Sequence, residues 1–356
     1  MCGTRPELIK LAPLVRWYGE NCAVVYTGQH YDPSLCTLLD AGFPASHRFH
    51  ELEIGSARRG IQLGRAISAV DEALAAHPDR VVLVQGDTTS ALAGALAANA
   101  QGLPLVHVEA GLRSHDRTMP EEHNRVLIDH LADLCCAPTG LNRQNLLKEN
   151  VAPQRIAVTG NTVVEALRAA LPCAADRAAI LAARGLAEDK YVLATIHRPE
   201  NVDDPHRLTT VLRELARLPL PVVLPLHPRT KRSLERFGLT PLLRPLRVLE
   251  PEPYPTFLAL AAAAALIISD SGGIQEEASV LKRPVVVVRR STERPEIFGT
   301  FGALVVPGPR ISTEAAAWLD DVAGHRERLR DLPSPYGDGA ASRRTAEAIE
   351  KLIQAG

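Results

Sequence analysis

Three carboxylates stand where an α/β chain would place groups that move protons. Asp87 follows one strand-like run, Glu109 ends the next, and Glu121 lies at the start of the helical stretch that follows. Because adjacent parallel strands lie about 4.8 Å apart, we expect Asp87 and Glu109 to share one crevice, with Glu121 facing it from the helix start. Crowded carboxylates shift each other's pKa, so one can hold a proton while another accepts one. The pattern predicts a general acid–base site.

The same residues also fit a structural interpretation. Asp87 and Glu121 would then cap helices, and Glu109 would pair with Arg113 four residues later. Spacing alone favours neither interpretation. What favours catalysis is that all three carboxylates lie at the predicted ligand-facing edge of the sheet.

A second pattern predicts a diphosphate site. In Ile267–Ala278 (IISDSGGIQEEA) a strand runs into a tight turn and then a helix. Ser271 can cap that helix, and Gly272 and Gly273 let a ligand approach the free N–H groups at the positive end of the helix dipole. Glu277, about two turns into the helix, can accept hydrogen bonds from a ribose diol. The alternative is an ordinary Ser-capped helix with a glycine turn.

Basic side chains occupy several other loop positions. One of them alone would be a solvated surface charge, but several converging at strand ends would form an anion site. They are Arg5, Lys10, His197, Arg198, His227, Arg229 and Arg294.

Common cofactor motifs are missing from the sequence. No G-x-G-x-x-G follows a predicted strand, so we expect no NAD or flavin, and no G-x-x-x-x-G-K-[ST] is present, which excludes a P-loop kinase. His107, His123 and His130 lie near carboxylates without a recognised zinc spacing, so we expect no metal.

These groups need a scaffold of alternating strands and helices. Short, continuous apolar runs alternate with helical patterns, which predicts parallel α/β units with right-handed crossovers. The predicted strands are Ala23–Tyr26, Arg80–Gln85, Pro104–Glu109, Leu134–Ala137, Arg155–Val158, Tyr191–Thr195, Pro221–Pro225, Arg247–Leu249, Leu266–Ser269 and Pro284–Val288, and the helical stretches include Arg58–Ala76, Thr88–Ala100 and Glu121–Asp133.

The alternation restarts after a helical connector at residues 162–189, so we expect two domains. The first covers residues 1–168 and the second residues 169–339, and a terminal helix within residues 340–356 packs back on the first. Two doubly wound domains facing one another would leave a ligand cleft between the carboxyl ends of their strands.

The composition excludes other classes of protein. The 356 residues carry 40 Lys and Arg against 41 Asp and Glu, a net charge of −1, so the chain is not built to coat nucleic acid or an anionic membrane. Its longest apolar run, Phe257–Ile268, is shorter than the ~20 residues that span a bilayer, and no secretion signal opens the sequence. Six cysteines without a C-x-x-C pair favour a reduced, cytoplasmic protein.

Ten short motifs, in one order along nearly the whole chain, resemble the non-hydrolysing UDP-N-acetylglucosamine 2-epimerase family. They are GTRPELIKLAPL (3–14), TGQH (27–30), GDTTS (86–90), HVEAGLRS (107–114), PEEHNR (120–125), TGN (159–161), TIHRPEN (195–201), LHPRT (226–230), SDSGGIQEEA (269–278) and TERPE (292–296). Each motif alone is weak, but the ordered set is specific.

The resemblance implies a fold, a reaction and a site. It implies two Rossmann-like doubly wound domains in the GT-B arrangement with the active site between them, and a homodimer. It implies that UDP-GlcNAc and UDP-ManNAc interconvert by elimination and re-addition of UDP through 2-acetamidoglucal, without NAD or metal. Motif by motif, it implies Asp87, Glu109, Glu121 and His197 as catalytic residues, Arg5, Lys10, Arg113, His227, Ser271, Gly272, Gly273, Glu277 and Arg294 as UDP-sugar contacts, and Gln29, Arg58 and His227 as a regulatory site.

The sequence departs from the family pattern in three places. Only Met1 and Cys2 precede Gly3, where family members usually have a central strand, and without that strand its neighbours would keep unpaired backbone groups. Tyr31 stands where an arginine often follows TGQH, which weighs against regulation. Arg290 stands where Asp is common, which is either a surface change or a preference for a more acidic sugar.

Several functions therefore stay open beside the epimerase. They are an epimerase of another UDP-2-acetamido sugar such as a diacetamido uronic acid, a hydrolysing variant that gives ManNAc and UDP, a GT-B glycosyltransferase, and a non-catalytic nucleotide-sugar sensor. The three carboxylates of the first domain favour an epimerase over a glycosyltransferase.

Overall fold

The computed structural model describes residues 1–28, 48–52, 54–55, 57–76 and 80–355. The chain divides into two compact units, Met1–Ala166 with Tyr336–Gly356, and Leu167–Pro335. Each unit contains parallel strands connected by helices, so the predicted α/β fold class is confirmed.

The first unit holds two parallel sheets. One pairs β1 (Ala23–Tyr26) with β2 (Arg48–Glu51), and the other has the order β3 (Val82–Gln85), β4 (Leu105–Val108), β5 (Leu134–Ala137) and β6 (Ile156–Val158). The register sets Gln85 beside Val108. The segments that follow β3 and β4 therefore leave the sheet at the same edge.

Met1 and Cys2 supply backbone hydrogen-bond partners to neighbouring segments of the first unit. The Cys2 N–H donates to the Val25 carbonyl (3.0 Å), and the Cys2 carbonyl accepts from the Thr27 N–H (2.9 Å). The terminal amino group of Met1 donates to the Leu83 carbonyl of β3 (2.9 Å). These two residues thus satisfy part of the backbone of β1 and β3.

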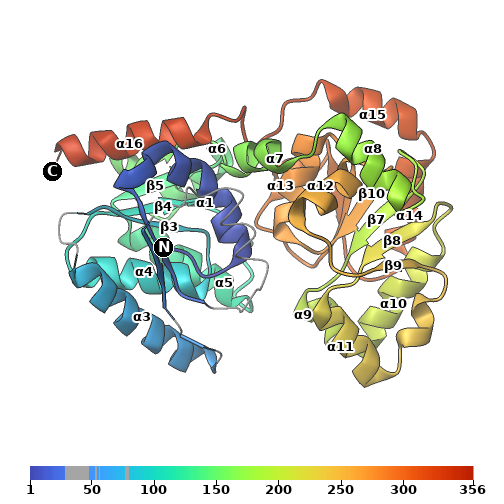
Figure 1. Ribbon diagram of the computed structural model, residues 1–356, viewed down its shortest axis with the longest axis horizontal. Helices are drawn as coiled ribbons and strands as arrows, with labels where there is room; N and C mark the ends of the chain where they lie inside the picture. The colour runs from blue at the N-terminus through green and yellow to red at the C-terminus, as the bar shows by residue number, and fades with distance from the viewer. Residues whose placement is uncertain (29–47, 53, 56, 77–79, 356) are drawn as a thin grey trace. The chain divides into compact units, whose positions relative to one another are not determined.

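Helices cover both faces of the first unit's strands. On one face lie α1 (Arg5–Tyr18) and α16 (Ala341–Ala355), and on the other lie α3 (Arg59–Ala75) and α4 (Thr89–Ala100) (Figure 1). The unit also contains α5 (Pro120–Leu131), α6 (Gly140–Lys148) and the start of α7 (Val163–Ala170). Small residues let α4 approach β3 closely, since a Cβ on Gly94 would come within 3.0 Å of Val84.

The second unit is one parallel sheet in doubly wound order. The order is β12 (Gly302–Val305), β11 (Val285–Val288), β10 (Leu266–Ser269), β7 (Val192–Thr195), β8 (Val222–Pro225) and β9 (Arg247–Leu249). The strand order reverses direction between β7 and β10. In open α/β sheets, ligands bind outside the carboxyl ends of the strands at such a switch point.

The helices of the second unit include the predicted one after the glycine turn. They are α8 (Ala174–Ala183), α9 (Pro199–Val202), α10 (Pro205–Ala216), α11 (Pro228–Phe237), α12 (Tyr254–Ala263), α13 (Gly272–Leu281), α14 (Arg310–Leu319) and α15 (Val322–Arg330). The ten predicted strands are all present, with ends within two residues of those predicted. The sequence did not predict β2, which is largely polar, or β12, which begins at Gly302 and closes one edge of its sheet.

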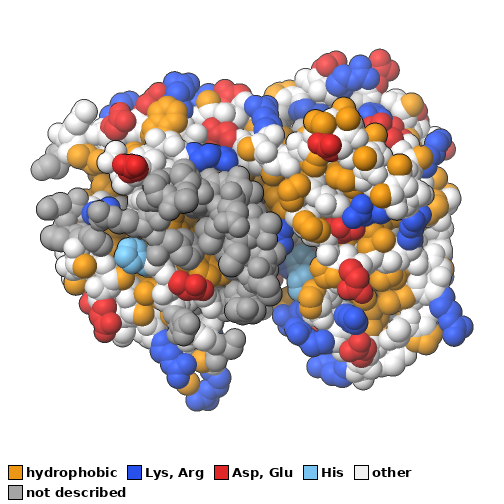
Figure 2. Space-filling view, viewed as in Figure 1, with side chains coloured by type: hydrophobic (Ala, Val, Ile, Leu, Met, Phe, Trp, Pro, Cys, Tyr) orange, Lys and Arg blue, Asp and Glu red, His pale blue; other side chains and the backbone are white. Residues whose placement is uncertain are grey.

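Basic and acidic side chains occur together on each unit in the face that Figure 2 shows, in keeping with the near-zero net charge. Among the described residues, no helix is both long and apolar enough to cross a membrane.

Candidate functional site

The switch point of the second sheet is organised by one buried carboxylate. Asp270, directly after β10, accepts hydrogen bonds from the backbone N–H groups of His197 (3.0 Å) and Arg198 (2.8 Å), which follow β7. The Asn201 side chain donates to the same carboxylate (2.9 Å). Asp270 therefore ties the His197 loop to the turn that precedes Ser271. The sequence placed Asp270 in a motif but did not predict this role.

The turn at Ser271 leaves the start of α13 open to an anion. Ser271 is the N-cap residue, as predicted, but its side chain makes no capping hydrogen bond, so that part of the prediction is wrong. The N–H groups of the first turn are therefore not satisfied by this side chain and can serve a phosphate. Gly272 is needed for space, because a Cβ there would lie 2.8 Å from Arg294 and 2.9 Å from Glu293. A Cβ on Gly273 would meet nothing within 4 Å, which leaves the turn accessible.

Partners inside the second unit hold Glu277 and Arg294 in place. Both side chains are buried. The Tyr254 hydroxyl donates to Glu277 (2.8 Å), a contact that the sequence did not predict. Arg294 donates to Glu276 (2.7 Å) and pairs with Glu293. These bonds fix the two groups that the family motif assigns to the nucleotide.

Two imidazoles stack beside this turn. The ring centroids of His197 and His227 are 4.9 Å apart, with 29° between the ring planes. His227 is the N-cap of α11, and its Nδ1 accepts from the Arg229 N–H (3.1 Å), so the proton of the neutral ring is on Nε2. Burial and the neighbouring His197 lower the pKa of His227 to about 4. Burial also lowers the pKa of His197, although the nearby Asp270 charge opposes this. Both rings are therefore neutral at pH 7, and an anionic ligand would favour protonation of His197.

Asp87, in the turn after β3, is held through both its side chain and its backbone carbonyl. The Asp87 carboxylate pairs with the buried guanidinium of Arg125 (Nε to oxygen, 3.1 Å), and the Asp87 carbonyl accepts from the Asn124 side chain (2.7 Å). Thr88 is the N-cap of α4, so the interpretation of Asp87 as a helix cap is wrong. The Asp87 side chain is 27% exposed, so it remains accessible to a ligand while Arg125 holds it.

A second buried carboxylate joins this turn to the start of α1. Glu7 accepts hydrogen bonds from the Thr88 hydroxyl (2.7 Å), the Thr4 hydroxyl (2.7 Å) and the Gly3 N–H (3.0 Å). Burial raises the pKa of Glu7, and these hydrogen bonds offset part of that effect. The half-buried Arg5 is the first residue of α1, next to this junction.

Glu109 is a buried carboxylate in an unusual backbone conformation. Its φ is 71°, which is rare for a residue with a side chain and typical of functional sites. Lys10 Nζ donates to both carboxylate oxygens (2.8 and 2.9 Å), and the Gln85 side-chain amide donates to one of them. The alternative pairing of Glu109 with Arg113 is wrong, because Arg113 binds other carboxylates. Lys10, predicted as a UDP-sugar contact, holds Glu109 here.

Glu121 differs from the other two carboxylates in being exposed. It is exposed in the first turn of α5, where it is not the N-cap, and it forms no hydrogen bond or ion pair with any described residue. Its neighbour Glu122 is buried and accepts from the Ser114 N–H (3.0 Å) and the His115 N–H (2.8 Å). Burial alone would raise the pKa of Glu122, but these bonds and the charge of Arg125 lower it overall. The structure thus brings Asp87 and Glu109 to one sheet edge and leaves the Glu121 side chain exposed.

Two other predicted contacts, Arg113 and Arg58, are described by the structure. Arg113 is buried and binds Asp129 (2.7 Å) and Glu149 (2.8 Å) inside the first unit. Arg58 is exposed as the N-cap residue of α3, and Gln29 lies outside the described residues.

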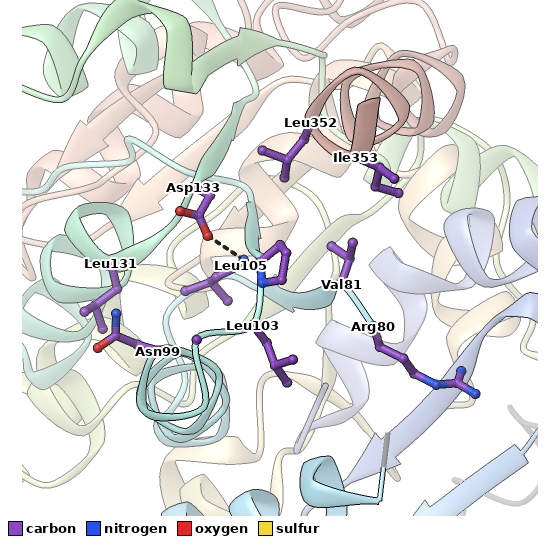
Figure 3. A pocket seen from close by; sticks show the side chains of 11 residues that line it. Arg80, Val81, Asn99, Leu103, Leu105, Leu131, Asp133, Leu352 and Ile353 are labelled. Atoms are coloured by element: carbon purple, nitrogen blue, oxygen red, sulfur yellow. Dashed lines mark hydrogen bonds between the residues drawn. The ribbon is translucent and has the colours of Figure 1, made fainter. Parts of the chain in front are cut away.

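The pocket in Figure 3 lies at the opposite end of the first unit's strands. Val81, Leu103 and Leu105 line it where β3 and β4 begin, and Leu352 and Ile353 line it from α16. It is therefore remote from the carboxyl ends that carry Asp87 and Glu109. No group of three or more metal-ligating side chains occurs in the described part of the chain.

Comparisons with known proteins show the family of the chain. The family model described as UDP-N-acetylglucosamine 2-epimerase matches residues 19–350. The chain belongs to this family. The UDP-N-acetylglucosamine 2-epimerase of Methanocaldococcus jannaschii is 36% identical over 359 residues, covering 98% of this chain and 97% of the relative. The UDP-2,3-diacetamido-2,3-dideoxy-D-glucuronate 2-epimerase of Pseudomonas aeruginosa is 35% identical and covers 98% of each.

A solved structure resembles this epimerase-family chain over its full length. The crystal structure of the Methanocaldococcus jannaschii enzyme in complex with UDP-GlcNAc and UDP has a TM-score of 0.87 and 35% identity, covering 100% of this chain and 98% of that one. The likeness establishes an enzyme of the epimerase class.

The sequence missed several residues that organise this epimerase-family site. Arg125 and Glu122 stand three residues apart in PEEHNR, which places them on one helical face and could have indicated their pairing. Gln85, Asn124 and Glu7 gave no comparable signal. Their partners come from other elements, so only the folded chain reveals them.

Proposed function

We propose that this chain is a non-hydrolysing UDP-N-acetylglucosamine 2-epimerase that interconverts UDP-GlcNAc and UDP-ManNAc. The observation that carries the proposal is the pair of fixed carboxylates, Asp87 and Glu109, at the carboxyl edge of the first unit's parallel strands. Membership of the family supplies the reaction class.

The chemistry explains why carboxylates and a diphosphate site are both needed. The C2 proton of the sugar lies next to an acetamido group and not a carbonyl, so a base cannot leave a stabilised carbanion there. A carboxylate removes the C2 proton while the anomeric C–O bond breaks, which gives 2-acetamidoglucal and UDP. UDP then adds back to C1, and a proton returns to C2 on the opposite face. Each general acid or base contributes roughly 10²–10⁴-fold to the rate.

Charge on the departing diphosphate is the second requirement. The N–H groups at the start of α13, with Arg5 and a protonated His197, would stabilise the leaving UDP. Asp87, Glu109 and Glu121 are the candidates for the proton transfers, and Glu121, exposed in the first turn of its helix, is accessible to the sugar. Glu277 would accept hydrogen bonds from the ribose, and the buried Arg294 would contact the nucleotide.

A second substrate has one observation in its favour. Arg290, exposed just beyond β11, makes no hydrogen bond or ion pair with any described residue. A guanidinium at the ligand-facing edge would suit a sugar carboxylate. The relative that acts on a diacetamido uronic acid is nearly as similar in sequence as the UDP-GlcNAc enzyme. Activity with UDP-2,3-diacetamido-glucuronate above that with UDP-GlcNAc, reversed by Arg290→Asp, would establish this alternative.

We further infer that the reaction needs neither NAD nor a metal, because elimination and re-addition change no oxidation state and use the protein's own charges. A homodimer in the cytoplasm, where UDP-sugars are made, is part of the proposal. Enzyme that has been treated with EDTA and freed of NAD should keep full activity. Analytical sedimentation should give twice the chain mass of 38.4 kDa.

The deciding experiment follows UDP-GlcNAc in D₂O by NMR. An epimerase incorporates deuterium at C2 and builds up UDP-ManNAc, and Glu109→Gln or Asp87→Asn should lower the exchange rate by at least about 10²-fold. Glu72→Gln, at an exposed position on α3, is the control and should leave the rate unchanged. Free ManNAc would indicate a hydrolase. Turnover that requires an added acceptor would indicate a glycosyltransferase, and binding of UDP-GlcNAc without exchange would indicate a sensor. Full exchange in Glu109→Gln would refute the role of Glu109.

A further inference from the structure

We propose that His107 is a positioning residue that holds the Asp87 turn through a buried, doubly protonated imidazole. This inference rests on the proposed function, since it concerns how the proton-transferring groups are kept in place. It assigns a role to a histidine that touches no substrate. His107 is the third residue of β4, two residues before Glu109, and its side chain is fully buried.

The two ring nitrogens of His107 face two hydrogen-bond acceptors. Nδ1 lies 2.6 Å from a carboxylate oxygen of Asp129, and Nε2 lies 2.9 Å from the carbonyl oxygen of Gly86. A carbonyl oxygen can only accept, so Nε2 must carry a proton. An ionised carboxylate can also only accept, so Nδ1 carries one as well. The ring is then an imidazolium paired with Asp129.

Asp129 remains ionised because it is surrounded by donors. Its second oxygen accepts from the Gly111 N–H (3.1 Å) and lies 2.7 Å from the Arg113 guanidinium. Burial alone would raise the pKa of Asp129, but the charges of His107 and Arg113 and their hydrogen bonds lower it overall. One carboxylate thus fixes His107 on one side and the backbone just after Glu109 on the other.

The bond to Gly86 acts on the backbone that leads into Asp87, while Arg125 holds the Asp87 carboxylate. The Gly86 carbonyl belongs to the peptide plane that leads into Asp87, and Gly86 itself is in the left-handed region (φ 69°), where a glycine can turn freely. Fixing that carbonyl restrains the plane, and adds to the restraints that Asn124 and Arg125 place on Asp87. A displacement of about 1 Å in a reacting group can cost about 10²-fold in rate. A histidine outside the substrate pocket can therefore control kcat.

Two substitutions separate the two bonds of the ring. In His107→Gln the side-chain amide can reach the place of Nε2 and still donate to Gly86. In His107→Asn the shorter amide takes the place of Nδ1 and donates to Asp129 only. We expect His107→Asn to lose about 10²-fold in kcat with little change in KM for UDP-GlcNAc, and His107→Gln to lose less than about tenfold. His130→Gln, at an exposed position next to Asp129, should match the wild type.

The kinetic comparison distinguishes positioning from general destabilisation. If both variants lost kcat equally, or if the Gln variant lost more than the Asn variant, the bond to Gly86 would not be the important one and the proposal would be wrong. A rise in KM without a fall in kcat would overturn it too.

An NMR measurement on the wild-type protein tests the bonding without any turnover. With ¹⁵N-histidine, we expect two slowly exchanging ring N–H signals that disappear in His107→Gln, with nitrogen shifts typical of an imidazolium. A single ring N–H would refute the imidazolium. If both signals are present but the wild-type protein does not exchange C2 of UDP-GlcNAc, the proposed function fails while the bonding stands, so the two failures can be told apart.

Discussion

Lys10→Met tests whether the buried pair with Glu109 organises the first unit. The substitution keeps a long, unbranched apolar chain and removes only the ammonium group. Lys10 Nζ lies 2.8 and 2.9 Å from the two carboxylate oxygens, and the side chains are 8% and 3% exposed. Removing one partner of a buried ion pair costs about 3–5 kcal/mol, because the remaining charge keeps its desolvation cost. Gln85 still donates to Glu109, so we expect the lower end, about 3 kcal/mol.

The double variant Lys10→Met/Glu109→Gln supplies the control for this reasoning. Without the carboxylate there is no unpaired charge, so the double variant should recover about 2 kcal/mol relative to Lys10→Met. Lys351→Met, at an exposed position on α16, should change stability by less than about 0.5 kcal/mol.

Urea unfolding of the first unit can measure these differences. Trp17 on α1 and Trp318 on α14 are the two tryptophans of the chain, so in a Trp318→Phe background the fluorescence reports on the first unit alone. With a urea m-value of about 2 kcal/mol/M, Lys10→Met should lower the midpoint by about 1.5 M. A shift below about 0.5 M, or a double variant no more stable than Lys10→Met, would refute the reasoning.

Three further predictions concern the backbone, a buried acid and the diphosphate site. Gly111→Ala should destabilise the first unit by more than about 2 kcal/mol in urea unfolding, because φ is 81° and a Cβ would lie 2.4 Å from the Asn142 carbonyl oxygen. The control is Gly140→Ala, where a Cβ meets nothing within 4 Å, and it should be neutral or slightly stabilising. Burial raises the pKa of the Glu7 carboxyl above its ordinary 4.5. The stability that Glu7 contributes is therefore fully present below pH 4.5 and is lost as the pH rises through the pKa of the folded state. Glu7→Gln should remove this decline in the free energy of unfolding, and parallel pH dependences in the wild type and the variant would contradict the assignment. Because burial lowers the pKa of His197, the protein should take up a proton when it binds UDP near pH 7. Calorimetry in buffers of different ionisation enthalpy measures this uptake, and His197→Asn should abolish it. Equal uptake in the variant would place the proton elsewhere.

Local patterns were enough to predict the scaffold and the positions of the main acids. The apolar runs of β5 and β10 have the predicted ends because a buried parallel strand needs a short continuous apolar segment, which the sequence displays directly. Asp87 and Glu109 reach one edge because successive parallel strands end on the same side of a sheet. The strand β2 was missed because its residues, RFHE, carry no apolar run.

Pairing across the fold was beyond the sequence. Spacing suggested Arg113 as the partner of Glu109, but the structure pairs Glu109 with Lys10, 99 residues away. The four-residue rule applies to neighbours on a helix, whereas Glu109 sits in a left-handed turn. Glu121 and Glu122 differ by one position, and a helical step of about 100° exposes one and buries the other.

The sequence by itself determined the alternating elements, the residues that end each strand and the family to compare with, because these depend on neighbours along the chain. Only the tertiary structure decided which charges are buried together and which backbone groups they hold. Those energies depend on burial and on distances of about 3 Å between atoms from remote segments, and linear spacing does not encode them.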